Sequence, residues 1–277
     1  RLTTTAVYYH WHWQCGAHFF YCKGKYFEIR HFTCTMLDET AHIVKEFVYC
    51  VLSRGGAKMS PTLYYLPPSP PCRAVLLLGK MLDIDFDLKI VNVLAGDQLK
   101  PEFLQLNPQH CIPTINDEGL VLWESRAILQ YLAAAYAKDD TLYPTDVRVR
   151  ALVDQRIHFD LGTLYARMFD YYLPTVLWSA PLDESKKPRL AEAFDWFNSA
   201  LKGHEFAATD HFTIADLTLL VTVSQCEAFG FDVDAYNRVK HWLRRCKDYM
   251  TPYGYEEING SKAVVLADMF RAKTEIP

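Results

Sequence analysis

Ser69 and Cys72 stand three positions apart, where an apolar run gives way to a proline-rich turn. A serine hydroxyl at the start of a helix can cap that helix, or it can donate a hydrogen bond to a bound anion. A cysteine thiolate is a nucleophile, but a cysteine on the inner face of a helix is more often buried and inert. Capping is the commoner role for a serine at this spacing, so the residues alone leave both interpretations open.

A second polar group, Glu124, Ser125 and Arg126, follows another short apolar run. These residues begin a segment with helical periodicity, and the free N–H groups and dipole of a helix start attract anions. An ordinary charged first turn with a capping serine explains the same residues almost equally well. The pattern therefore indicates either a plain helix start or an anion-binding site.

Short elements of alternating type are expected to position these residues. Alternating or continuous apolar runs predict strands, and apolar residues at 3.6-residue spacing predict helices. The resulting order is strand, helix, strand, helix, hairpin, helix, which is an α/β arrangement. The expected strands cover 63–66, 88–93, 114–115 and 120–122, and the expected helices cover 72–81, 99–106 and 124–136.

The rest of the chain is predicted to be all-helical. A polar, turn-rich segment at 138–146 is expected to be a linker, and residues 147–277 then follow a helical period. Thr213 and Asp216 have the spacing of a capping box, so we interpret Asp216 as structural. Helices are expected over 149–173, 190–201, from Thr213 onward, 236–249 and 262–273.

The chain has 277 residues and a formal net charge of −4. This length predicts two domains at roughly 100 to 200 residues each. The ordinary glycine and proline content excludes a collagen-like or wholly disordered chain. No apolar run reaches the length of a membrane span, and the weak negative charge gives nucleic acid no reason to bind. A small molecule or a second copy of the chain is the expected partner.

Residues 1–58 differ in composition from the rest. They hold four of the eight cysteines and five of the ten histidines, and their net charge is +3 (seven basic, four acidic) against −7 for the remainder. A zinc module is a weak alternative, because these cysteines and histidines lack the paired spacing of zinc ligands. We expect an extension that is disordered or unrelated to the fold, and assign it no function and no metal.

Five motifs from Met59 onward, in this order, resemble cytosolic glutathione transferases of the insect delta class. The resemblance covers residues 59–277 and implies a thioredoxin-like α/β domain at 59–137 that binds glutathione. It also implies an all-helical domain at 147–277 that forms the electrophile pocket, and a cytoplasmic homodimer. The motifs lie at 64–73, 99–103, 107–114, 122–128 and 212–216.

By this resemblance Ser69 is the residue that activates the glutathione sulfur. A free thiol with a pKa of about 8.5 is only slightly ionised near neutrality, and lowering that pKa by about two units requires about 2.7 kcal/mol. A hydroxyl donating to a charged sulfur contributes about 1.5 to 3 kcal/mol, and a helix start adds about 0.3 to 1 kcal/mol. One hydroxyl at a helix start is therefore enough.

The resemblance also assigns the contacts to the rest of glutathione. His110 is expected to hold the glycyl carboxylate, and a cis Ile112–Pro113 peptide leaves the Ile112 backbone open to the cysteinyl part. Ser125 is expected to hold the γ-glutamyl carboxylate and Glu124 the ammonium, with Arg126 beside them. The glutathione-binding residues expected in this way are His110, Ile112, Pro113, Glu124, Ser125 and Arg126.

Two residues depart from the family pattern. Gln98 stands where many members carry histidine, so one carboxylate contact becomes a neutral hydrogen bond or is lost. Pro68 replaces the glycine common before the serine, which stiffens the turn and could shift the Ser69 hydroxyl.

The second substrate is expected to be an apolar electrophile. Met and aromatic side chains adapt to shape, so broad specificity and a role in detoxification are expected. The same residues also fit an ordinary core stripe. The expected pocket residues are Leu66, Tyr165, Met168, Phe169 and Tyr172.

Two other functions remain as alternatives, a non-catalytic carrier of hydrophobic ligands and a thiol-disulfide oxidoreductase. The second would use Cys72, but a hydroxyl at position 69 cannot form a mixed disulfide. Glutathione is the expected co-substrate, and no cofactor is expected.

Overall fold

The computed structural model describes residues 17–22, 25–30 and 60–274. The chain divides into two compact units, 1–58 and 59–277. In the first unit, β1 (Ala17–Cys22) and β2 (Lys25–Arg30) pair as an antiparallel hairpin, which we did not predict. The expected disorder of the remainder of this segment, and the side chains of the zinc alternative, lie outside the described residues.

The second unit begins with a four-stranded sheet in the order β4-β3-β5-β6. β3 runs parallel to β4 and antiparallel to β5, and β5 and β6 form a hairpin. In the centre of the sheet, Leu63 of β3 stands opposite Ile115 of β5, and both are fully buried. The strands are β3 (Thr62–Tyr65), β4 (Asp87–Ile90), β5 (Thr114–Asp117) and β6 (Leu120–Trp123).

The hairpin turn is tighter than the four residues expected at 116–119. Glu118 and Gly119 both have positive φ, 51° and 95°, and a two-residue turn of this kind matches the twist of the flanking strands. The strands consequently extend to Asp117 and Leu120.

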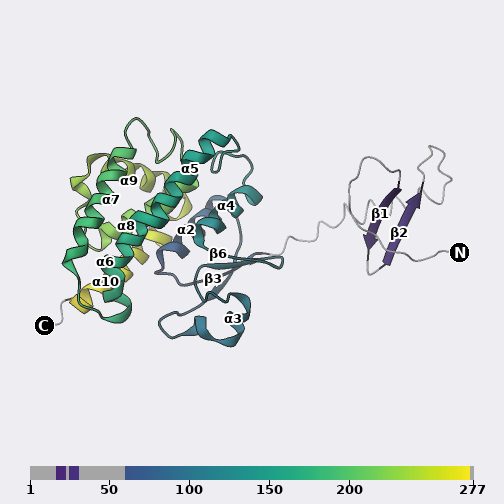
Figure 1. The fold of residues 1–277 in the computed structure, drawn as a ribbon, viewed down its shortest axis with the longest axis horizontal. Coiled ribbons are helices and arrows are strands. Elements are labelled where there is room, and N and C mark those ends of the chain that lie inside the picture. Colours follow the sequence, from purple (N-terminus) through teal and green to yellow (C-terminus); the bar gives the residue numbers. More distant parts are fainter. Residues whose placement is uncertain (1–16, 23–24, 31–59, 275–277) are drawn as a thin grey trace. The chain divides into compact units, whose positions relative to one another are not determined.

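Helices cover both faces of the sheet. Figure 1 shows α2 and α4 on one side of the sheet and α3 on the other. α2 begins two residues earlier than expected, because Pro70 and Pro71 occupy its first two positions, where no backbone N–H is needed. These helices are α2 (Pro70–Met81), the short η1 (Asp97–Leu99), α3 (Pro101–Leu106) and α4 (Ser125–Tyr136).

The remainder is all-helical, as expected, and its helices pack around α8. Nearly every residue of α8 is buried, as in a helix surrounded by others on all sides. The helix expected at 149–173 is α5 and α6, joined through the π-helical turn η2. The elements are α5 (Val147–Phe159), η2 (Asp160–Leu164), α6 (Tyr165–Trp178), η3 (Glu184–Lys186), α7 (Lys187–Ala200), α8 (Ile214–Ala228), η4 (Val233–Ala235), α9 (Asn237–Met250), η5 (Thr251–Tyr253), the π-helical η6 (Glu256–Gly260) and α10 (Ser261–Thr274).

No helix in the described part of the chain has the length and apolar character needed to cross a lipid bilayer.

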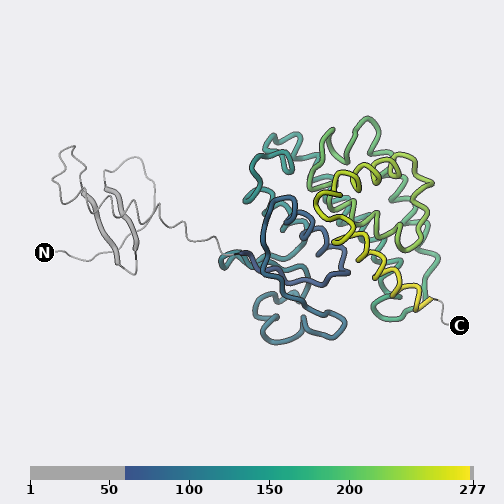
Figure 2. The backbone as a smooth tube through the Cα atoms, turned by 180° about the vertical axis from the view of Figure 1, so that it is seen from behind, coloured from purple at the N-terminus to yellow at the C-terminus, as the bar shows by residue number. Residues whose placement is uncertain are grey.

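A buried arginine joins the sheet domain to the helical domain. Arg73 of α2 is fully buried and donates to Asn259 Oδ1 at 2.7 Å, to the Asn259 carbonyl at 3.0 Å and to Gln225 Oε1 at 2.5 Å. Figure 2 shows the yellow C-terminal segment, which contains Asn259, beside the blue α2. Burial lowers the pKa of Arg73 to about 10, so the side chain stays charged at neutral pH.

Asp216 organises the start of α8, as the capping-box pattern predicted. It is fully buried and accepts hydrogen bonds from Thr213 N (2.9 Å) and Thr213 Oγ1 (3.0 Å). It also accepts from Ala207 N (2.6 Å) and Trp242 Nε1 (2.8 Å). Burial raises the pKa of Asp216, while these donors act in the opposite direction. The carboxylate therefore ties α8 to α9 and to the preceding loop.

We predict that Asp216→Ala lowers the free energy of unfolding by about 3 kcal/mol or more, because it leaves several buried donors without an acceptor. Urea unfolding followed by tryptophan fluorescence measures this loss. Asp210→Ala is the control, since the Asp210 side chain is 77% exposed, and it should change stability by no more than about 0.5 kcal/mol. Equal unfolding midpoints for the two variants would contradict the structural role of Asp216.

Candidate active site

Ser69 lies at the junction of β3 and α2, as its spacing predicted. A turn closed by a 3.0 Å hydrogen bond from Ser69 N to the Leu66 carbonyl accommodates Pro68, and Ser69 takes the extended N-cap conformation (φ −69°, ψ 119°). Its hydroxyl makes no capping hydrogen bond to the helix. Prolines at the first two helical positions have no N–H to be capped, which leaves the hydroxyl available for another partner.

Cys72 is fully buried beneath this turn. Burial raises the pKa of the Cys72 thiol to about 11, although hydrogen bonding with the Ser69 side chain and the Leu66 backbone acts in the opposite direction. Cys72 is therefore a protonated thiol at neutral pH. A buried, protonated sulfur is a poor nucleophile, which is the opposite of what a thiol-disulfide oxidoreductase requires.

Ser125 and Arg126 begin α4 and connect it to the helical domain. Arg126 Nη1 donates to Ser125 Oγ at 3.0 Å, and Arg126 Nη2 donates to Asp160 Oδ2 at 2.5 Å. All three residues are buried, and Asp160 Oδ1 has no hydrogen-bond partner among the described residues. Because Ser125 Oγ accepts from Arg126, its own proton is free to donate to a ligand.

Glu124 is exposed at the N-cap of α4 and has a positive φ of 67°. Positive φ is uncommon for a residue with a side chain, and such conformations gather at functional sites. With this conformation the Glu124 side chain is exposed to solvent, whereas Ser125 and Arg126, which follow it, are buried.

The loop before β5 carries His110, Ile112 and Pro113. His110 is exposed with φ of 45°, and the Ile112–Pro113 peptide is cis, as the resemblance implied. The Ile112 N–H and C=O make no backbone hydrogen bond within residues 60–274. The buried Asn107 supports this loop, since its Nδ2 donates to the Cys111 carbonyl at 3.1 Å and to Thr114 Oγ1 at 2.9 Å.

Gln98 belongs to η1, which precedes α3. Its side-chain Oε1 is buried and has no hydrogen-bond partner among the described residues. The residue itself is only partly buried, and an amide oxygen without a partner can accept a hydrogen bond from a ligand.

The expected electrophile-pocket residues divide into two groups. Leu66, Tyr165 and Phe169 are partly exposed. Met168 and Tyr172 are instead core residues, 0% and 4% exposed, and Tyr172 stacks on Phe229, the C-cap residue of α8. The structure therefore places these two side chains in the interior, whereas they were expected on the pocket wall. They lie beside Tyr165 and Phe169 on α6, on the adjacent face that is turned toward the interior of the helical domain.

The side chains near Ser69 enclose a narrow cleft of about 10 Å³ between the two domains. Pro70 and Pro71 line it from α2, Arg126 from α4 and Tyr165 from α6. The Arg126 guanidinium lies 4.7 Å from the centre of the Tyr165 ring. The starts of α2 and α4 and the aromatic side of α6 thus meet at one place.

Residues 63–140 match the family model for the glutathione S-transferase N-terminal domain, and residues 165–248 match the model for the C-terminal domain. Glutathione S-transferase D7 of Anopheles gambiae is 60% identical over 215 residues, which are 78% of this chain and 99% of that protein. A solved delta-class transferase of Nilaparvata lugens is 43% identical with a TM-score of 0.74, over 77% of this chain and all of that one. The chain belongs to the delta-class glutathione transferases.

A more distant solved relative of this transferase is a glutathione transferase homologue of Drosophila mojavensis. It is 32% identical, with a TM-score of 0.72 over 77% of this chain and 97% of its own, and it contains bound glutathione. Glutathione transferase is therefore the activity of this chain, and the thiol-disulfide alternative is left without support.

Two residues near the transferase site were missed by sequence reasoning. Asp160 is a buried acid within a helical stretch, and Arg156, one turn earlier, is a nearer base than Arg126, so the sequence gives no signal for the pair with Arg126. Trp178 ends α6 with 67% exposure, and its ring lies 6.4 Å from that of Phe169. A large aromatic residue exposed at a helix end carries no sequence signal of its own.

The state of Cys72 generates a direct prediction for the transferase. At pH 8, N-ethylmaleimide should modify the partly exposed Cys111 well before the buried Cys72, because only an accessible thiolate reacts. Peptide mass mapping after timed exposure measures both rates. Modification of Cys72 as fast as Cys111 would contradict a buried, protonated thiol.

Proposed function

We propose that the Ser69 hydroxyl donates a hydrogen bond to the sulfur of bound glutathione and keeps it as a thiolate. The observation that carries this proposal is a serine at a helix start whose hydroxyl makes no cap. A hydroxyl has one donor and two acceptor sites, so Ser69 can accept from the Cys72 thiol and still direct its own proton to the ligand. Cys72 then holds the hydroxyl in position without reacting.

The electrostatics of α2 support the same role. The thiolate would lie at the positive end of the helix dipole. Arg73, four residues beyond Ser69, is a buried cation that no carboxylate partners within the described residues. The positive charge of Arg73 acts to lower the pKa of Cys72, against the larger effect of burial. The same charge would lower the pKa of a glutathione sulfur bound near Ser69.

The remaining contacts follow the chemistry of the tripeptide. Ser125 donates to the γ-glutamyl carboxylate, with Arg126 adding positive charge, and the exposed Glu124 pairs with the ammonium group. The Ile112 N–H and C=O pair with the cysteinyl unit as an added strand would, and Pro113 keeps that edge open. His110 holds the glycyl carboxylate, and the Gln98 side-chain amide offers a neutral hydrogen bond nearby. The bound glutathione in the D. mojavensis homologue supports a tripeptide at this site.

The reaction is attack of the thiolate on an electrophilic carbon. A C–S bond forms, and either a halide leaves with its bonding electrons or an unsaturated carbonyl takes the electrons onto oxygen and is then protonated by water. The thiol proton passes to solvent when glutathione binds. Ser69 acts by stabilising the negative sulfur, so no proton needs to be stored on the protein.

The electrophile is proposed to be apolar and variable in shape, as in detoxification. Leu66, Tyr165 and Phe169 form the accessible wall, and Trp178 extends it toward the end of α6. No contact among the described residues favours the non-catalytic carrier over catalysis.

We further propose a cytoplasmic homodimer, as in the family it resembles. Large apolar side chains are exposed on β6 (Leu120) and on α5 and η2 (Val147, Leu152, Leu161), and such surfaces mark sites of association. Four cysteines of residues 60–274 are free thiols, which fits a reducing compartment; they are Cys72, Cys111, Cys226 and Cys246.

The domain boundaries are proposed at 59–137, 138–146 and 147–277, for the glutathione-binding domain, the linker and the helical domain. The two family models, which match on either side of this linker, support the division. Residues 1–58 precede the segment that these models cover.

We predict that Ser69→Ala lowers kcat/KM for an aryl halide by roughly a hundredfold, because the lost hydrogen bond to a charged sulfur is worth about 2 to 3 kcal/mol. Steady-state conjugation kinetics measure this change. Ser199→Ala, at an exposed position of α7, is the control and should keep the parent rate. A Ser69→Ala variant as active as the control would reject the role of the hydroxyl.

Ser125→Ala should act on binding rather than on the chemical step. Loss of one hydrogen bond to a carboxylate should raise KM for glutathione roughly tenfold or more, with a smaller change in kcat. The KM for the electrophile, measured at saturating glutathione, serves as an internal control and should not move. A fall in kcat at constant KM for glutathione would be incompatible with this assignment.

A further inference from the structure

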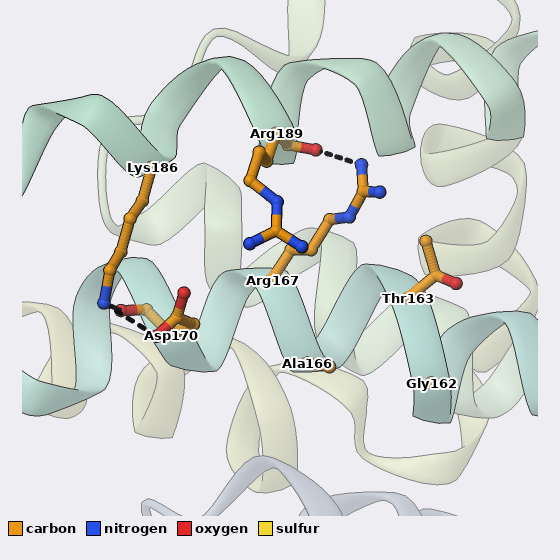
Figure 3. A pocket seen from close by; sticks show the side chains of 7 residues that line it. All are labelled: Gly162, Thr163, Ala166, Arg167, Asp170, Lys186 and Arg189. Carbon is orange, nitrogen blue, oxygen red and sulfur yellow. Dashed lines mark hydrogen bonds and ion pairs between the residues drawn. The ribbon is translucent and has the colours of Figure 1, made fainter.

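A cavity among the described residues lies away from the glutathione site, between α6 and α7. It has a volume of about 290 Å³, and Figure 3 shows the side chains around it. It is on another face of α6, since Arg167 is two residues and about 200° around the helix from Tyr165. Its lining includes Gly162, Thr163, Arg167, Asp170, Lys186 and Arg189.

Contacts between the two helices fix one cationic side chain of this cavity, that of Arg167. Arg167 Nη1 donates to the Arg189 carbonyl and, at 2.8 Å, to Glu192 Oε2 of α7. The guanidinium also lies 4.7 Å from the centre of the Trp196 ring. Its position is therefore set before any ligand arrives.

A proline fixes the second cationic side chain, that of Lys186. Pro174 has no N–H, so the Asp170 carbonyl one turn earlier loses its helical partner. Lys186 Nζ donates a hydrogen bond to this carbonyl oxygen at 3.3 Å and to Asp170 Oδ1 at 2.7 Å. The proline in α6 thus creates the acceptor that holds the other end of the cavity.

Arg189 is the cation that these contacts leave free. Figure 3 shows its guanidinium between the two helices beside that of Arg167. The Arg189 side chain has no ion pair or hydrogen bond with any described residue, and neither does the Thr163 hydroxyl on the facing wall. Three cationic side chains face two anionic ones here, Asp170 and Glu192, which leaves an excess of one positive charge.

The start of α7 adds to this positive potential. Its first turn carries Lys187 and Arg189 and no acidic residue, although a helix start favours negative charge. The acids of the preceding η3 are engaged elsewhere, since Asp183 accepts from Ser185 and Glu184 accepts from Tyr171. An anion in the cavity would relieve this unfavourable arrangement.

We propose that this cavity binds a small organic anion through a carboxylate or phosphate group. The Arg189 guanidinium donates two parallel hydrogen bonds to two oxygens of that group, and the Thr163 hydroxyl donates to a third acceptor on the ligand. Gly162, which has no side chain, leaves space beside Thr163 for the body of the ligand. The site is separate from the glutathione site and does not depend on Ser69.

Calorimetric titration of the full-length protein with citrate, and separately with inorganic phosphate, tests this site. Saturable binding is expected, and Arg189→Gln should weaken the affinity at least tenfold, because the bidentate hydrogen bonds of the Arg189 guanidinium are the main contacts to the anion. Lys187→Gln is the matched control, since it removes the same charge from the same helical turn outside the cavity lining. Conjugation kinetics of Arg189→Gln should equal those of the parent.

Two results would overturn the proposal. One is equal affinity in the Arg189→Gln and Lys187→Gln variants, or no saturable binding of either anion. The other is an Arg189→Gln variant that leaves anion affinity unchanged but weakens self-association in sedimentation experiments. That outcome would assign Arg189 to a carboxylate of a second copy instead.

Discussion

The burial of the Arg73 guanidinium is the constraint on which the geometry of the site depends. A charged group without a carboxylate partner is costly to bury, and here carbonyl and amide oxygens of Asn259 and Gln225 offset that cost. Those oxygens belong to η6 and α8, so the charge can be satisfied only when α2 is docked on the helical domain. Ser69 lies at the N-terminus of α2, so the docking of α2 on the helical domain also sets the position of Ser69.

A second charged connection acts at the other side of the site. Arg126, at the start of α4, pairs with Asp160 in the π-helical turn between α5 and α6. This pair sets the distance between the residues proposed for the γ-glutamyl end and the aromatic side of α6. Two buried arginines therefore align the sheet domain, which supplies the polar contacts, with the helical domain, which supplies the apolar wall. Separating Arg73 from its acceptors, or Arg126 from Asp160, would leave a buried charge without a partner. This cost holds the two domains in a fixed relative orientation.

Local signals predicted much of this arrangement. The proline-rich turn, the alternating strands and the capping box at Asp216 each depend on neighbours in sequence, and the structure contains all of them. The exposed side of α6 was harder to predict, because Tyr165, Met168, Phe169 and Tyr172 all fit one helical stripe, and spacing alone does not show which edge of a stripe other helices cover. Met168 and Tyr172 lie on the covered edge and point into the core. The partners of Arg73 and Arg126 lie 186 and 34 residues away, and no local pattern announces such pairs.

The central claim is that a single hydroxyl at the start of α2 keeps the sulfur of glutathione ionised. Titrating the ultraviolet absorbance of the thiolate in the saturated glutathione complex against pH tests this most directly. The account predicts a sulfur pKa about two units below the value of about 8.5 for a free thiol. A bound sulfur that titrates near the free value would contradict it.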